Sequence, residues 1–130
     1  MKFTTEYLNG KTLYNVYEEE CDTHDNQGEC TETNPKWVMS VFSFTDTTFS
    51  IYKSDKPNEK LEGKYSITSE GYIKLLSNNE ARYIKALEVT NDYIRLDWKN
   101  KKEDLNTDNY TEYVYFDETK AKAFLADKNS

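Results

Sequence analysis

The carboxylates Glu88, Asp97 and Glu112 lie inside predicted β-strands, where two of them could form an acid–base pair. Two carboxyl groups that share an apolar interior have separated pKa values and can carry out glycosidase-type chemistry. Glu88 and Asp97 alternate with the apolar residues of their strands, so we expect both to face solvent. Only Glu112 shares a face with apolar neighbours. Because one inward carboxylate does not make a catalytic pair, we expect a protein that is not an enzyme.

His24 is the one histidine of the chain and the natural candidate for a general base. No serine lies in a G-x-S-x-G motif. A Ser–His or Cys–His pair would therefore need a remote partner that no local motif supplies. We expect an exposed loop histidine.

A run of acidic residues surrounds His24 and could supply oxygen ligands to Ca²⁺. Its members are Glu18, Glu19, Glu20, Asp22, Asp25, Glu29 and Glu32. The EF-hand pattern fails because Gln27 stands where that pattern demands glycine. A zinc site made of Cys21, His24 and Cys30 would lack the second ligand pair that structural zinc sites use. The sequence favours a solvated loop with no metal or cofactor, and leaves calcium as the alternative.

Cys21 and Cys30 are the only cysteines, and they flank this polar segment. Their spacing predicts a disulfide across a hairpin loop, which would stabilise the fold by about 2.6 kcal/mol in the chain-entropy model. Disulfides persist in oxidising compartments, so we expect a periplasmic or extracellular protein. The alternative is two exposed free thiols in the cytosol. The N-terminus has no apolar signal segment, so we expect a mature form with an added Met, secreted or lipid-anchored in its full-length precursor.

Aromatic residues spread over several predicted strands could line a small apolar ligand pocket. The candidates are Trp37, Phe42, Phe44, Phe49, Tyr65, Tyr83, Trp98 and Phe116. The same rings could instead fill the interior as a solid core, as they do in small barrels. The sequence is compatible with either arrangement.

The elements that position these residues are short aromatic and β-branched runs separated by turn residues. They predict eight strands at about 12–18, 36–44, 47–53, 61–67, 72–76, 81–89, 93–98 and 110–116. Hairpin-length connections exclude parallel crossovers and predict an all-β, antiparallel up-and-down barrel. The chain is expected to form a single domain over residues 1–130.

Two segments depart from the strand pattern. A short helical turn within 3–10 can plug one end of the barrel and stop at Gly10. A helix at about 118–127 carries the apolar stripe Ala121, Phe124 and Leu125, and Asp117 can cap it. We expect this helix to pack against the outside of the barrel.

The composition limits the partners. Seventeen Lys and Arg oppose 24 Asp and Glu, for a net charge of −7. This balance argues against nucleic acid and against anionic membrane surfaces. No apolar run approaches the roughly 18 residues of a membrane span. Nineteen aromatic residues, 11 of them Tyr, exclude a disordered acidic chain.

The order of these parts resembles the calycins, and more narrowly the short bacterial lipocalin-like domains. An N-terminal turn leads into the entry strand Leu8-Asn9-Gly10-Lys11-Thr12-Leu13-Tyr14, followed by a meander and a final helix. Gly10-Lys11-Thr12 matches the lipocalin Gly-x-Trp motif with Thr in place of Trp. Arg95 or Arg82 stands in loosely for the arginine that covers that Trp. The resemblance implies a secreted or lipid-anchored barrel that binds a small ligand.

These observations predict a monomeric, non-enzymatic, extracytoplasmic protein that binds a small hydrophobic or amphipathic molecule. The alternative is a protein–protein interaction module, such as a small β-barrel protease inhibitor whose disulfide-braced loop engages a partner protein.

Overall fold

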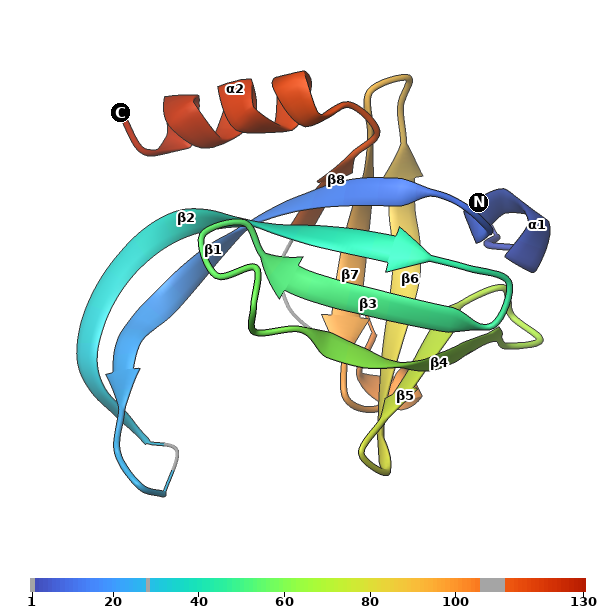
Figure 1. Cartoon of the computed structure of the whole chain (residues 1–130), viewed down its shortest axis with the longest axis horizontal. Helices are drawn as coiled ribbons and strands as arrows, with labels where there is room; N and C mark the ends of the chain where they lie inside the picture. The colour runs from blue at the N-terminus through green and yellow to red at the C-terminus, as the bar shows by residue number, and fades with distance from the viewer. Residues whose placement is uncertain (1, 28, 106–111) are drawn as a thin grey trace.

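The chain folds into a closed antiparallel β-barrel with a short helix at one end and a longer helix on the outside (Figure 1). The computed structural model describes residues 2–27, 29–105 and 112–130, with backbone alone for residues 20–24 and 32–35. Its strands are β1 (Thr12–His24), β2 (Cys30–Phe44), β3 (Thr48–Lys53), β4 (Leu61–Ile67), β5 (Ile73–Ser77), β6 (Glu80–Val89), β7 (Tyr93–Lys99) and β8 (Glu112–Tyr115). Each strand pairs with the next, and β8 returns to β1. The predicted eight-stranded barrel is confirmed; positions 110 and 111 of its last predicted strand lie outside the described residues.

The barrel interior is a cluster of buried apolar side chains, which the strands supply from every second position. At one end the short helix α1 (Thr5–Leu8) closes the barrel with Leu8, which is fully buried. The hydroxyl of Thr4 caps α1 by accepting a hydrogen bond from the backbone N–H of Tyr7 at 3.1 Å. The predicted N-terminal plug is therefore confirmed.

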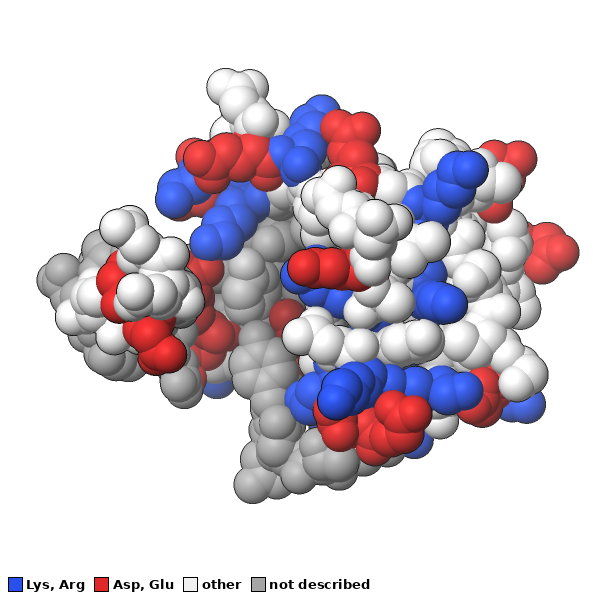
Figure 2. Space-filling model, turned by 90° about the horizontal axis from the view of Figure 1, so that it is seen from below, with Lys and Arg blue, Asp and Glu red and all other residues white. Residues whose placement is uncertain are grey.

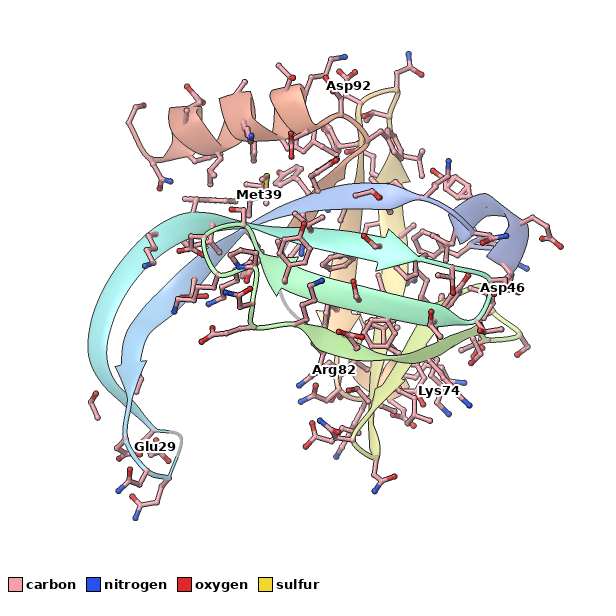
Figure 3. The ribbon with its side chains drawn as sticks, viewed as in Figure 1. Glu29, Met39, Asp46, Lys74, Arg82 and Asp92 are labelled. Atoms are coloured by element: carbon pink, nitrogen blue, oxygen red, sulfur yellow. The ribbon has the colours of Figure 1, made fainter. Side chains whose placement is uncertain are left out.

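The C-terminal helix α2 (Glu118–Lys128) packs on the outside of the barrel, over β1, β2 and β8. Ala121 is fully buried there, and Phe124 and Leu125 pack beside it against a second apolar cluster. Figure 3 shows Met39 of β2 between the sheet and this helix. The docking stripe was predicted correctly, whereas the predicted cap was wrong. Asp117 stands at the N-cap position but its side chain makes no capping hydrogen bond.

Beyond the last turn of α2, the side chain of Asn129 pairs with the backbone of β2. Its Oδ1 accepts a hydrogen bond from the N–H of Trp37 at 3.2 Å, and its Nδ2 donates one to the carbonyl oxygen of Trp37 at 3.1 Å. The β2–β3 ladder ends where Ser40 faces Lys53, so Trp37 lies past the end of β3. The asparagine amide thus satisfies backbone groups that a neighbouring strand would otherwise bind. Within the described residues, neither helix has the length and apolar character needed to cross a membrane.

β1 and β2 continue past the barrel as a two-stranded hairpin, which we call the arm (residues 17–24 and 30–38). Figure 1 shows it curving away from the barrel wall. Three register shifts between Glu19 and His24 accompany the curve, because β-bulges bend the strand that carries them. The prediction that the acidic segment is a loop was wrong over most of its length. Charged residues have low strand propensity, yet here the two backbones pair with each other regardless of side chain.

The connection at the tip of the arm is short. Asp25 holds it by accepting hydrogen bonds on Oδ1 from the N–H groups of Gln27 at 2.9 Å and Glu29 at 3.0 Å. The predicted disulfide requires the side chain of Cys21, which lies outside the described side chains, as does the imidazole of His24. The bond between Cys21 and Cys30 therefore stays a prediction.

Candidate functional site

A pocket of about 260 Å³ lies at the polar end of the barrel interior. Its lining comes from five strands and consists of Asn15, Tyr17, Ser40, Phe42, Ile51, Trp98 and Glu112. The volume is just below the range of roughly 300–1,000 Å³ that is common for small-molecule sites. The site therefore suits a compact ligand.

The strands place polar groups here because their inward-facing positions change from apolar to polar toward this end of the barrel. On β1 the inward residues are Leu13, then Asn15 and Tyr17. On the antiparallel strand β2 the apolar Phe42 and the polar Ser40 occupy the corresponding inward positions. The register sets Leu13 opposite Phe42 and Asn15 opposite Ser40, so the change occurs at the same level on both strands.

Two hydrogen bonds order the polar side chains of the pocket. The Nδ2 of Asn15 donates to Oε1 of Glu112 at 3.2 Å, and the Oγ of Ser40 donates to the hydroxyl of Tyr17 at 3.2 Å. Asn15 is 1% exposed and Glu112 is 5% exposed. The Oδ1 of Asn15 has no hydrogen-bond partner among the described residues. A buried acceptor of this kind costs free energy unless something donates to it.

Burial raises the pKa of Tyr17, while the hydrogen bond with Ser40 and the nearby Lys53 ammonium oppose the shift. The phenol is therefore neutral at physiological pH and keeps its proton for hydrogen bonding. Lys53 itself lies outside the pocket lining and forms an ion pair with Glu19 on the arm. That hydrogen bond with Glu19 raises the pKa of Lys53.

Most of the predicted aromatic residues meet in the interior, but few line the pocket. The core includes Phe42, Phe44, Phe49 and Tyr65, with Trp98 and Phe116 packed against it. Ring contacts join Phe42 to Trp98 at 5.7 Å and Phe44 to Tyr65 at 5.2 Å between centroids. Only Phe42 and Trp98 also belong to the pocket lining.

The prediction that Trp37 faces the interior was wrong. Trp37 lies on the outer face of β2 with Met39, and its ring centroid is 5.9 Å from that of Phe124 on α2. The apolar run of β2 has both faces covered, one by the core and one by the helix. Hydrophobicity therefore could not assign the face of this residue.

Tyr83 also faces outward, contrary to the prediction. It stands opposite Lys74 in the β5–β6 ladder, and the Lys74 ammonium lies 6.0 Å from the centre of its ring. Figure 3 shows Lys74 on the outside of the barrel. The neighbouring Ile84 occupies the interior at 1% exposure. A bulge between Ala86 and Glu88 shifts the alternation along β6, so strict alternation over the whole strand assigns Tyr83 to the wrong face.

Among the three acid–base candidates, Glu112 faces inward as predicted, and Glu88 is exposed and pairs with Arg95 at 3.5 Å. Asp97 was expected in solvent but is 1% exposed. It lies on the outer face of β7, where the Lys99 ammonium binds its Oδ1 at 2.8 Å. The alternation of apolar and polar residues therefore predicted correctly that Asp97 points out of the barrel. The prediction that its side chain is exposed to solvent was wrong.

The two arginines that the lipocalin resemblance singled out both form ion pairs, Arg95 across to β6 and Arg82 along its own strand β6. Arg95 binds Glu88, and Arg82 lies 3.7 Å from Glu80. Thr12, which stands at the tryptophan position of the motif, is exposed. No group of three or more His, Cys, Asp or Glu side chains with metal-binding geometry occurs within the described part of the chain.

Sequence reasoning missed the residues that make the pocket polar: Asn15, Tyr17 and Ser40. A signal was present, because Asn15 interrupts an otherwise apolar inward face between Leu13 and the aromatic Tyr17. A buried amide in such a row marks a place where the interior is polar.

The fold and the pocket define an eight-stranded antiparallel barrel whose layout is compatible with that of the lipocalins. Comparisons of the chain with protein-family models, with curated proteins and with solved structures find no match in any of the three.

Proposed function

We propose that this protein binds a small amphipathic molecule at the polar end of its barrel and carries out no chemistry on it. The observation that carries the proposal is the pocket itself, where an aromatic wall formed by Phe42 and Trp98 faces the buried polar groups of Asn15 and Glu112. A ligand with an apolar body and one polar end would satisfy both sides.

The size of the pocket limits the ligand and its affinity. A volume of 260 Å³ corresponds to about nine times the share of one water molecule in the liquid, so roughly nine non-hydrogen atoms fit. At about 0.5 kcal/mol per atom, such a ligand reaches a Kd on the order of 1 mM or somewhat tighter. Titrations must therefore extend to millimolar concentrations.

Trp98 supplies the direct test, because its indole lies in the pocket lining. In a Trp37→Phe background the emission reports Trp98 alone, and we expect a saturable shift or quenching with small amphipathic compounds. Replacing Trp98 by Leu instead leaves Trp37 as the reporter on the outside, and its emission should not respond. If a broad panel leaves Trp98 emission unchanged up to about 10 mM, where a ligand with a 1 mM Kd is nearly saturating, the binding proposal fails.

An extracytoplasmic setting belongs to the same proposal and rests on the predicted disulfide. We expect the unreduced protein to be two hydrogens lighter by mass spectrometry than the reduced form. Two titratable thiols in protein purified without reductant would contradict both the Cys21–Cys30 bond and the exported setting.

The arm favours a second candidate function, a protein–protein interaction module such as a protease inhibitor. It projects from the barrel, and Figure 2 shows it standing apart from the barrel body with acidic side chains at its tip. The test is inhibition of a panel of serine and cysteine proteases by the intact protein, compared with a variant in which residues 20–32 are replaced by a two-residue turn. Inhibition that disappears in the shortened variant would favour this function over ligand binding.

A further inference from the structure

The polar wall of the pocket holds a hydrogen-bond acceptor that has no donor. The Nδ2 of Asn15 donates to Glu112, whereas the Oδ1 of the same amide has no hydrogen-bond partner among the described residues. Asn15 lines the pocket and is 1% exposed, so bulk water reaches this oxygen poorly. A buried acceptor that stays unpaired costs free energy. A ligand that brings an N–H or O–H group into the pocket can remove this cost.

The same wall also holds a donor. The Ser40 hydroxyl donates to the oxygen of Tyr17 at 3.2 Å, so this bond does not use the proton of the phenol. Burial raises the pKa of Tyr17, which keeps that proton in place at physiological pH. The phenol can therefore donate to a ligand, and the indole N–H of Trp98 is a second donor of the lining. A ligand that matches this wall carries both an acceptor and a donor.

The positions of these groups require that the acceptor and the donor of the ligand lie close together. Asn15 and Tyr17 are two residues apart on β1, so they occupy neighbouring places on its inward face. The pocket has room for about nine non-hydrogen atoms, most of which must fill its apolar part. An amide is a compact neutral group that joins an N–H donor directly to a carbonyl acceptor.

The apolar part of the pocket suits a flat or ring-shaped body. Phe42 and Trp98 lie edge to face, with 5.7 Å between their ring centroids, and Ile51 completes this side of the lining. Aromatic rings and aliphatic groups in such a wall pack well against another ring. A small amide with a ring attached therefore complements both the polar and the apolar parts of the lining.

We propose that the pocket selects small neutral amides with an aromatic or alicyclic body over molecules of the same shape that lack an N–H donor. This inference rests on the proposed ligand-binding function and names its ligand class. The amide N–H donates to Oδ1 of Asn15, and the amide oxygen accepts from the hydroxyl of Tyr17. The body of the ligand lies against Trp98 and Phe42.

Three probes of nearly equal size and shape test the selection: benzamide, acetophenone and benzoate. Benzamide carries a donor and an acceptor, whereas the ketone and the carboxylate carry acceptors alone. Each is titrated to about 10 mM, at which a ligand with a 1 mM Kd is nearly saturating. The readout is the indole N–H signal of Trp98 in proton–nitrogen NMR spectra, because acetophenone absorbs ultraviolet light and would distort emission. The Trp37→Phe variant distinguishes this signal from that of the other tryptophan.

We expect benzamide to bind at least fivefold more tightly than acetophenone, and benzoate to bind more weakly than either. Removing an amide from water is costly unless the site supplies hydrogen bonds, so this preference must come from the pocket. Equal affinities, or a preference for the ketone or the carboxylate, would overturn the inference and leave the proposed function intact. Failure of all three probes, together with the broad panel, would overturn both.

Two variants assign the hydrogen bonds to their residues. Asn15→Leu is close in size but has no acceptor, and we expect it to bring benzamide and acetophenone within twofold of each other. Tyr17→Phe removes the donor, and we expect it to weaken both compounds at least fivefold. Tyr52→Phe is the matched control, because it removes a phenol hydroxyl from the outer face of β3, where residues alternate with the buried Phe49 and Ile51.

A preference for benzamide that persists in Asn15→Leu would refute the role of the Asn15 oxygen. An equal loss in Tyr17→Phe and Tyr52→Phe would refute the role of the Tyr17 hydroxyl. If a pocket variant does not fold, the ranking of the three probes on the unaltered protein still decides whether the pocket selects amides.

Discussion

Removing the Phe124 ring should undock α2 from the barrel. The ring contacts three other rings, with centroid distances of 5.9 Å to Trp37, 5.1 Å to Tyr113 and 5.5 Å to Tyr115. A fully buried Phe→Ala change costs about 3–5 kcal/mol. Because Phe124 is only half-buried, the loss of area is smaller, but the aromatic pairs add to it. We therefore expect Phe124→Ala to lower the free energy of unfolding by about 2–3 kcal/mol.

Urea unfolding followed by far-ultraviolet circular dichroism measures this change. Trp37 fluorescence gives a second, local readout, because two residues of α2 lie against its ring. One is Phe124, and the other is Lys128, whose ammonium is 5.1 Å from the centre of the ring. Lys122→Ala is the control on the exposed side of the same helix, where the ion pair with Glu118 at 3.6 Å is worth about 0.3–0.5 kcal/mol. If Phe124→Ala costs no more than this control and leaves Trp37 emission unchanged, α2 does not dock through Phe124.

Three further changes test other parts of the fold. Asn129→Ala should cost about 1 kcal/mol and speed hydrogen exchange at the Trp37 amide, because two hydrogen bonds to the β2 backbone are lost; unchanged exchange would contradict this pairing. The Lys102 ammonium lowers the pKa of Glu70 from 4.5 to about 2, so carboxyl NMR should show this group ionised until about pH 2 and Lys102→Met should raise that pKa. Because the pKa is lowered in the folded state, the contribution of this pair to stability is present above pH 4.5 and is lost as the pH falls toward 2. Gly63→Ala should destabilise by about 1–3 kcal/mol in urea unfolding, since its Cβ would lie 2.1 Å from a carbonyl oxygen of β5; a neutral result would refute this packing.

The barrel could be predicted because local sequence patterns mark its strands: short aromatic and β-branched runs separated by turn residues. The strand at Leu61–Ile67 was predicted with both of its ends, and the docking stripe of α2 followed from the helical spacing of its apolar residues. The outer part of the arm could not be predicted, since charged and polar residues carry most of the strand pairing there. Its length is set by the pairing of two backbones, which composition does not reveal.

The pocket was predicted in part. Trp98 and Phe42 were among the expected lining residues, and Glu112 was expected to point inward. The partners of Glu112 depend on which positions face each other across β1, β2 and β8. That register is set only when the barrel closes. The hydrogen bond between Asn15 and Glu112 therefore could not be predicted from the sequence of either segment alone.

The closure of the barrel has a consequence for how the chain folds. The ladder between β1 and β8 comprises three residue pairs within the described part of the chain, and it joins Tyr14 to Tyr115, about a hundred residues apart. Contacts of such high sequence separation form late and slowly, because the entropy of closing a long loop is lost before the contact forms. A nascent chain therefore exposes two open sheet edges until β8 is available. The helix α2 then packs over both strands of this short ladder, β1 and β8. β8 and α2 thus decide whether β1 is held in the barrel on both of its edges.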